Sequence, residues 1–257
     1  MRYAATARLA ELDPVPEHEL MARLIVTCEF PFDAQRAMEL AVLRTFGIPA
    51  ISRQLVRSGM FLDAPSLRVA RTQSLLTALV EQGYSGRVGA EMLARIDRAH
   101  DGMPRDTDPM RFVLATFVFE PSRWVRRFGW RPLLDTEERA AFLFWRAVGG
   151  RLGIGVPERR DAFERFYDDY QAREMVFAPE NQRLAESVRD HRLARLPVPA
   201  QVLGRHVMHG LIDDRLRLAC GLPSAPPAIA AALPSVIRMR GKVASVLCRG
   251  MEPVTWA

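Results

Sequence analysis

The stretch Ser66–His100, which reads SLRVARTQSLLTALVEQGYSGRVGAEMLARIDRAH, guides our interpretation of the whole chain. Its first part, Ser66–Gln82, contains no proline or glycine and is rich in leucine, alanine, glutamine and arginine, which favour a helix. Gly83 ends this part, as glycine often does after a helix. A second helix is predicted from Ser85 to His100, where the following Asp-Gly-Met-Pro sequence stops it. Two helices joined by a short turn are therefore expected here.

One face of the first predicted helix combines apolar side chains with two arginines and a threonine. Residues three and four positions apart share a helix face, and here they are Arg68, Arg71, Thr72, Leu75, Leu76 and Leu79. A buried arginine needs an anionic partner, which a ligand carboxylate or phosphate would supply. Alternatively, the arginines lie at the edge of this face and extend into water along their apolar stems. Both interpretations stay open on this stretch alone.

His100 follows the apolar stripe of the second helix, Met92, Leu93 and Ile96, by one turn. A histidine in the last turn is stabilised as a cation by the helix dipole, so it is also a typical cap. Neutral imidazole is, however, the commonest metal ligand. Zinc would need further ligands at suitable spacing, whereas one axial histidine is enough for haem, because the porphyrin supplies the other four nitrogens. We therefore predict a haem between the two helices, with His100 as the ligand of its iron.

The motif R-x-x-x-T at residues 68–72, followed by R-I-x-x-x-H at 95–100, resembles the bacterial latex-clearing proteins, or rubber oxygenases. It also resembles the fungal mycophenolic-acid-pathway oxygenase that cuts a prenyl side chain. Further segments resemble blocks of that family in the same order, and they are FPFDAQRAMELAVLRTFGIPAIS, DPMRFVLATFVFEPSRWVRRFGWRPL, ERAAFLFWRAVGGRLGIGVP and LIDDRLRLACGLP. The resemblance covers roughly residues 11–223 and implies a haem-b-dependent, MpaB-like oxygenase.

The resemblance also implies roles for particular residues. His100 corresponds to the proximal haem ligand, and Arg68 and Thr72 correspond to the arginine and threonine beside the haem. Arg71 stands where latex-clearing proteins have a distal lysine, and arginine cannot lose a proton and coordinate iron as a lysine amine does. The rubber oxygenases also use a glutamate on the segment before the arginine helix, but residues 42–80 of this chain contain no glutamate.

We expect Arg68, Arg71 and Thr72 to be catalytic residues that also contact the cofactor. The two arginines would pair with the haem propionates or polarise dioxygen, and Thr72 would donate a hydrogen bond to an oxygen species. The cofactor would carry out the oxygen chemistry, while the protein sets the iron ligand, the polarity and the access. Oxidative double-bond cleavage is the reaction that the resemblance implies.

Residues 111–120 are predicted to be helical because the neighbouring segments are, although their composition leaves a strand possible; Phe112 and Thr116 share a face of this helix. We expect both to contact the cofactor, although such a stripe is also typical of an ordinary core. The substrate is expected to be an apolar or prenylated small molecule. Its pocket would be drawn from Phe46, Phe112, Phe117, Phe142 and Trp145.

The composition, with 49% apolar and 26% charged residues, is typical of a soluble globular protein. No apolar run reaches the length of about eighteen residues that predicts a membrane-spanning helix. The first residues, MRYAATARLAELDP, lack the apolar core of a signal peptide. The three cysteines lie far apart without a CxxC pair, which indicates reduced thiols. We therefore expect a cytoplasmic protein.

The net charge of +6 comes almost entirely from arginine, because Lys242 is the only lysine among 36 basic residues. Nucleic-acid binding would need a concentrated basic face, whereas these arginines are spread along the chain and mostly alternate with acids. We therefore expect no nucleic-acid partner. Two alternatives to an enzyme stay open: a non-catalytic carrier of haem or a hydrophobic ligand, and a basic helical protein that binds nucleic acid.

Helical patterns dominate the chain, so we predict an all-α fold with one domain over residues 1–257 that encloses the haem pocket. Residues 1–13 are expected to form an N-terminal arm. Residues 224–257 are expected to form a tail that either wraps the core or mediates self-association as a homodimer. His206 and His209 are three residues apart and share a predicted helix face, but no third metal ligand stands at suitable spacing.

Overall fold

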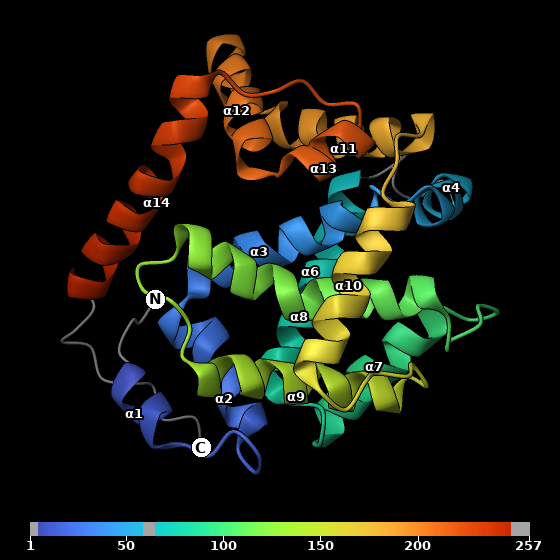
Figure 1. Ribbon diagram of the computed structural model, residues 1–257, viewed down its shortest axis with the longest axis vertical. Helices are drawn as coiled ribbons and strands as arrows, with labels where there is room; N and C mark the ends of the chain where they lie inside the picture. The colour runs from blue at the N-terminus through green and yellow to red at the C-terminus, as the bar shows by residue number, and fades with distance from the viewer. Residues whose placement is uncertain (1–4, 59–64, 248–257) are drawn as a thin grey trace.

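The computed structural model describes residues 5–58 and 65–247, without the side chains of residues 65–70 and 247. The described residues form one helical domain and contain no strand (Figure 1), so the predicted all-α class is confirmed. In chain order the elements are α1 (Thr6–Glu11), α2 (His18–Leu24), the π-helix η1 (Ile25–Glu29), α3 (Pro31–Thr45), α4 (Pro49–Arg57), α6 (Pro65–Gln82), α7 (Arg87–Ala99), α8 (Asp108–Phe128), α9 (Asp135–Arg151), α10 (Arg160–Glu174), α11 (Pro179–Leu193), α12 (Val198–Leu211), α13 (Asp214–Ala219) and α14 (Pro227–Leu247).

Helix α8 runs through the middle of the molecule, and α3, α9 and α10 pack around it (Figure 1). Pro109 lies in its first turn, where a helix needs no backbone donor. Helix α8 is longer than the helix predicted for residues 111–120, because it continues past Pro121 to Phe128. A proline inside a helix costs about 3 kcal/mol. Burial of Trp124, Val125 and Phe128 beyond the proline offsets that cost.

The core between α8, α9 and α10 is dominated by stacked aromatic side chains. Phe112 on α8 stacks on Tyr167 and Tyr170 of α10, with ring centroids 5.4 and 4.9 Å apart. Aromatic pairs at this spacing stabilise beyond the area that they bury. Helix α9 approaches α8 closely at Gly149, where an added Cβ would lie 2.6 Å from Cδ2 of Leu114. The contact between α8 and α9 therefore requires glycine at this position.

Both ends of the described chain pack onto the core. Helix α1 lies within the expected N-terminal arm, and its Leu9 is fully buried. Helix α14 lies within the expected tail, at the left edge of the molecule in Figure 1, with Gly241 against Trp130. Lys242 is exposed on α14. Among the residues described, no helix combines the length and hydrophobicity that a bilayer crossing requires.

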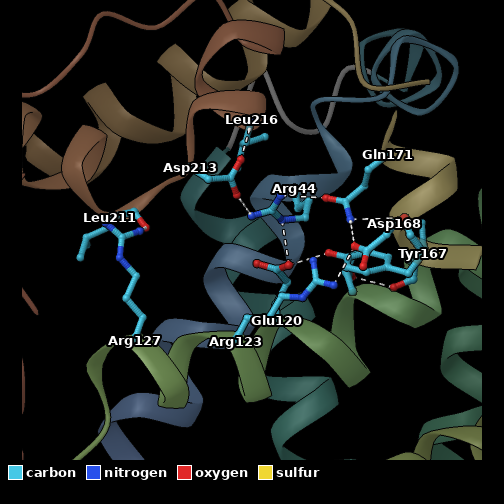
Figure 2. A network of polar contacts seen from close by, with 12 residues as sticks. Arg44, Glu120, Arg123, Arg127, Tyr167, Asp168, Gln171, Leu211, Asp213 and Leu216 are labelled. Carbon is cyan, nitrogen blue, oxygen red and sulfur yellow. Dashed lines mark hydrogen bonds and ion pairs between the residues drawn. The ribbon is translucent and has the colours of Figure 1, made fainter. Parts of the chain in front are cut away.

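A buried network of charged groups joins α3 to α8, α10 and the start of α13 (Figure 2). Arg44 is 5% exposed, and its Nε atom lies 2.9 Å from Oε1 of Glu120 on α8. Arg44 also donates hydrogen bonds to Gln171 on α10, at 2.8 Å, and to Asp213 at the start of α13. Tyr167 donates a 2.6 Å hydrogen bond to Glu120. These partners provide the compensation that a buried charge requires.

Candidate functional site

Helices α6 and α7 pack against each other, as the sequence predicts, and border a cavity of about 680 Å³. Side chains from α3, α4, α8 and α9 complete its wall. Most of the lining side chains are apolar, such as Leu55, Leu75, Ile96, Val113 and Val148. Pockets of roughly 300–1,000 Å³ with mostly apolar walls and a few polar groups are typical of small-molecule sites. This cavity is therefore the candidate ligand site.

Three of the predicted site residues line this cavity. Arg71 and Thr72 come from α6, and His100 directly follows α7. Arg71 is exposed and Thr72 is half-buried, so the cavity opens to solvent beside the arginine. The side chain of Arg68 lies outside the described residues. The predicted helix pair thus brings a guanidinium, a hydroxyl and an imidazole into one wall.

The imidazole of His100 is held by its own helix. Its Nδ1 atom lies 2.8 Å from the carbonyl oxygen of Ile96, and because a carbonyl oxygen only accepts, Nδ1 carries the proton. In the neutral ring this arrangement leaves the lone pair on Nε2. A hydrogen bond from one ring nitrogen to a carbonyl oxygen commonly fixes the tautomer and the orientation of a metal-ligating histidine. The hydrogen bond to Ile96 therefore leaves Nε2 as the ring nitrogen that could bind a ligand.

Arg105 fixes the backbone at the end of α7. It donates hydrogen bonds to the carbonyl oxygens of His100 and of Asp97, the latter at 2.8 Å, and pairs with the Asp97 carboxylate at 2.8 Å. Both carbonyl oxygens also accept backbone hydrogen bonds, from the N–H groups of His100 and Met103, so Arg105 adds a second donor to each. Arg105 was not among the predicted site residues. It lies in a polar loop, and only its five-residue separation from His100 marks it in the sequence.

The charges that line the cavity are unbalanced. Arg71 and Arg105 are cationic, and the acid in the described part of the wall, Asp97, is paired with Arg105. Arg71 makes no hydrogen bond or ion pair with the residues that the structure describes. An unpaired guanidinium beside an apolar cavity favours a ligand that carries a negative group. The wall therefore suits a mostly apolar ligand with an anionic edge.

Two of the five aromatic residues predicted for the substrate pocket line this cavity. They are Phe117 and Trp145, whose stacked rings have centroids 5.3 Å apart. Phe46, Phe112 and Phe142 are buried and are not among the residues that line it. A buried aromatic position looks the same in sequence whether it faces the core or a cavity. The helical spacing of the aromatic residues therefore could not distinguish those that line the cavity from those buried in the core.

The two further residues that were expected to contact the cofactor also lie away from the cavity. Phe112 packs between the rings of α10 described above. Thr116 is fully buried, and its hydroxyl donates a 2.7 Å hydrogen bond to the carbonyl oxygen of Val113. Both side chains belong to the core, because both are fully buried and Phe112 stacks on Tyr167 and Tyr170. We therefore leave both out of the candidate site.

His206 and His209 lie together on α12, as their spacing predicts. His209 is 5% exposed, and burial lowers its pKa, an effect that the nearby charges of Arg189 and His206 reinforce. No cluster of three or more side chains that could hold a metal ion occurs among the described residues. The pair is therefore a half-buried and a buried histidine of α12, without the third ligand that a metal site needs.

Comparison with known proteins places this domain in a family. Residues 35–241 match the model of the family described as "ER-bound oxygenase mpaB/B'/Rubber oxygenase, catalytic domain". The helical domain with this cavity is therefore an oxygenase catalytic domain. The chain belongs to the family of mpaB-type and rubber oxygenases, and the resemblance inferred from its motifs is confirmed.

Individual fungal proteins show the same relationship. The ER-bound oxygenase mpaB of Penicillium roqueforti is 28% identical over 250 residues, which cover 85% of this chain and 84% of that protein. The ER-bound oxygenase mpaB' of Penicillium brevicompactum is 29% identical over 241 residues, which cover 86% of this chain and 57% of that protein. The mpaB protein of the same species is 29% identical over 187 residues, 65% of this chain and 47% of its own length. The chain thus matches about half the length of the two P. brevicompactum relatives.

Proposed function

We propose that the chain is a haem-b-dependent oxygenase that acts with dioxygen on an apolar or prenylated small molecule. One observation carries the proposal: a mostly apolar cavity of about 680 Å³ is lined by His100, whose Nδ1 is already bonded, and by Arg71. Haem, a largely apolar cofactor that carries an iron and two carboxylates, would be held in this wall by His100 and Arg71. When bound, haem would supply the oxygen chemistry, and the chain would set ligand, polarity and access.

Each residue of the wall has a role in this proposal. His100 would hold the iron through Nε2, while the Ile96 carbonyl oxygen holds the ring through Nδ1. Arg71 would pair with a propionate or polarise dioxygen, because its guanidinium is always charged and presents several N–H donors in one plane. Thr72 adds a hydroxyl side chain to the same wall. Arg68 keeps its expected role beside the cofactor as part of the proposal.

We further propose that the reaction is oxidative cleavage of a carbon–carbon double bond. Both atoms of dioxygen enter the two new carbonyl groups, so the reaction balances without an external reductant. No glutamate lines the described part of the wall, and Asp97 is occupied by Arg105. The cleavage would therefore proceed without the carboxylate base that the resemblance implies for rubber oxygenases.

The absorption spectrum of the purified protein with added haem tests the cofactor assignment. We expect a Soret band that is lost in His100→Ala and retained in the matched variants His206→Ala and His209→Ala, which change histidines outside the cavity. A wild-type protein that carries no Soret band after haem addition and removal of unbound haem by gel filtration would remove the roles proposed for all four site residues. Retention of the band in His100→Ala would remove the role of that ligand alone.

A second candidate function is a non-catalytic carrier of haem or a hydrophobic ligand. The arginine at position 71, where the rubber oxygenases have lysine, and the lack of glutamate in the described wall favour it. Turnover of an alkene under oxygen separates the carrier from the enzyme.

A cytoplasmic location, a homodimer and the absence of a nucleic-acid partner complete the main proposal. Because phosphate contacts release counterions, nucleic-acid binding that falls steeply with added salt would contradict the last of these.

A further inference from the structure

Three arginines that lie far apart in the sequence come together between α3, α11 and α14. They are Arg36 on α3, Arg192 on α11 and Arg240 on α14. In Figure 1 α11 lies above α3, and α14 lies to its left. None of the three arginines lines the cavity of the candidate site, which we call the first cavity, or a second cavity of about 600 Å³ that also borders α6, α8 and α9. The cluster is therefore separate from the proposed oxygenase site.

Glu39 on α3 joins two of these arginines. Its carboxylate oxygens pair with Arg36 at 2.7 Å and with Arg192 at 2.5 Å. The Glu39 side chain is 12% exposed, whereas the side chains of Arg36 and Arg192 are 28% and 37% exposed. The carboxylate is thus more buried than the two arginines that it joins, and both arginines keep access to solvent.

The ring of Phe32 brings the third arginine to the same place. The Cζ atom of Arg240 lies 3.5 Å from the centroid of this ring, and the Cζ atom of Arg36 lies 5.8 Å from it. A guanidinium within about 6 Å of an aromatic centroid is attracted by the ring. Arg240 is exposed and makes no hydrogen bond or ion pair with the residues that the structure describes. Its N–H donors are therefore available to a ligand.

The charges of the cluster do not balance. A second carboxylate near these cations is that of Asp33, on which the charge of Arg240 acts. Asp33 is 1% exposed, and its carboxylate accepts a 2.9 Å hydrogen bond from Nε1 of Trp124. Three guanidiniums thus share the carboxylates of Glu39 and Asp33, and the second of these is already bonded in the core. An excess of positive charge remains.

The cations of the cluster oppose one another. Burial is the main cause that lowers the pKa of Arg36, and the charges of Arg192 and Arg240 lower it further, although Glu39 acts in the other direction. A bound anion would relieve this repulsion, because opposite charges attract most strongly where water is partly excluded. Arginine suits phosphate in particular, since its planar guanidinium donates to two phosphate oxygens at once.

We propose that Arg36, Arg192 and Arg240 form a binding site for a phosphate-bearing ligand, either a diphosphate or a phosphate monoester. Arg36 and Arg240 donate to the phosphate oxygens from beside the ring of Phe32, and Arg192 donates from α11. The bound ligand joins α14 to α3 and α11. This inference goes beyond the proposed function and does not depend on haem.

Isothermal titration calorimetry of the full chain with inorganic pyrophosphate tests the site, at a constant ionic strength of about 0.15 M. Arg240→Gln is expected to weaken binding by about tenfold or more, because it removes hydrogen bonds to a charged group. Lys242→Gln is the matched control, since it removes the same charge from α14 at a position that faces another way. It should bind within about twofold of wild type, because exposed charges are screened beyond about 8 Å at this ionic strength.

Wild-type protein that binds no pyrophosphate, or equal weakening in Arg240→Gln and Lys242→Gln, would overturn the site. If Arg240→Gln does not fold, Arg192→Gln removes a cation of the cluster from α11, and the same criterion applies.

Vesicles distinguish the two sources of a phosphate group. Sedimentation of the protein with phosphatidic acid vesicles but not with phosphatidylcholine vesicles, reduced in Arg240→Gln, would support the site with a lipid headgroup as its ligand. Pyrophosphate binding that depends on Arg240, without such sedimentation, would support the site with a soluble phosphate compound as its ligand.

Discussion

The Nε atom of Arg44 lies 2.9 Å from Oε1 of Glu120, and the two side chains are 6% and 1% exposed. The pair joins α3 to α8, and both helices also supply side chains to the first cavity, such as Val42 and Val113. A buried ion pair contributes little net stability, but loss of one partner leaves an uncompensated buried charge. The cavity wall is therefore sensitive to changes at residues that do not touch the cavity.

Arg44→Met is expected to lower the free energy of unfolding by about 3–5 kcal/mol, because Glu120 and Asp213 lose their cation. Urea unfolding measures this loss. Addition of Glu120→Gln to Arg44→Met should recover part of it by removing the uncompensated charge. Arg87→Met, at a side chain that is 87% exposed, should leave the unfolding midpoint close to that of wild type. Equal losses in Arg44→Met and Arg87→Met would contradict the prediction.

Stability should fall in acid through Asp213. Burial alone would raise the pKa of Asp213, but the charge and hydrogen bond of Arg44 outweigh burial and hold the pKa below its usual 3.8. A carboxyl group with a lowered pKa stabilises the fold above its usual pKa, and this contribution disappears as the pH falls through the folded value. We therefore expect the free energy of unfolding to decrease below about pH 4.

Asp213→Asn should reduce the decrease in the free energy of unfolding between about pH 6 and pH 3, as measured by urea unfolding. Asp214→Asn is the matched neighbour, because the Asp214 side chain is 84% exposed, and it should keep the wild-type acid dependence. Superimposable acid curves for wild type and Asp213→Asn would rule out this source of the pH effect.

Gly149→Ala and Gly150→Ala should have opposite effects on thermal stability. A Cβ at Gly149 would lie 2.6 Å from Cδ2 of Leu114, so overpacking is expected to cost about 1–3 kcal/mol. A Cβ at Gly150 would meet nothing within 4 Å, and alanine should stabilise the helix by up to about 1 kcal/mol. Thermal unfolding measures both. A Gly149→Ala variant as stable as Gly150→Ala would show that α8 and α9 can separate freely.

Arg71→Ala should impair turnover but not folding. Arg71 is exposed and has no partner among the described residues, so its loss should change stability by less than about 0.5 kcal/mol. Loss of a charged hydrogen bond to the ligand should cost roughly 1.5–3 kcal/mol, or a factor of ten or more in activity. Arg71→Lys keeps the charge without the planar fork and should recover part of the activity. Wild-type turnover together with wild-type melting in Arg71→Ala would disprove the role.

Local features of this chain were predictable from its sequence. The helix pair α6 and α7 follows from residue spacing and from Gly83, and the same spacing explains why Arg71, Thr72 and His100 line one cavity. The extension of α8 beyond Pro121 was not predictable, because it depends on buried contacts made by residues that follow the proline.

Features that depend on contacts between residues far apart in the sequence could not be predicted either, because tertiary packing decides them. Phe112 and Phe117 both belong to the apolar run of α8, but tertiary packing places one against α10 and the other beside the cavities. Nothing local in the sequence pairs Arg44 with Glu120. Leu76, Phe117 and Trp145 each line two cavities, and this arrangement likewise forms only when α6, α8 and α9 pack together.

Lys242 is the only lysine of the chain, and it is exposed on α14. Apart from the amino terminus, an amine-reactive reagent therefore has one target on the protein. A short bifunctional cross-linker can join the lysines of two copies only if their C-terminal helices lie within the reach of its spacer. Covalent dimers formed through Lys242 would thus place α14 at the subunit interface, and a dye attached there would report on one known surface position.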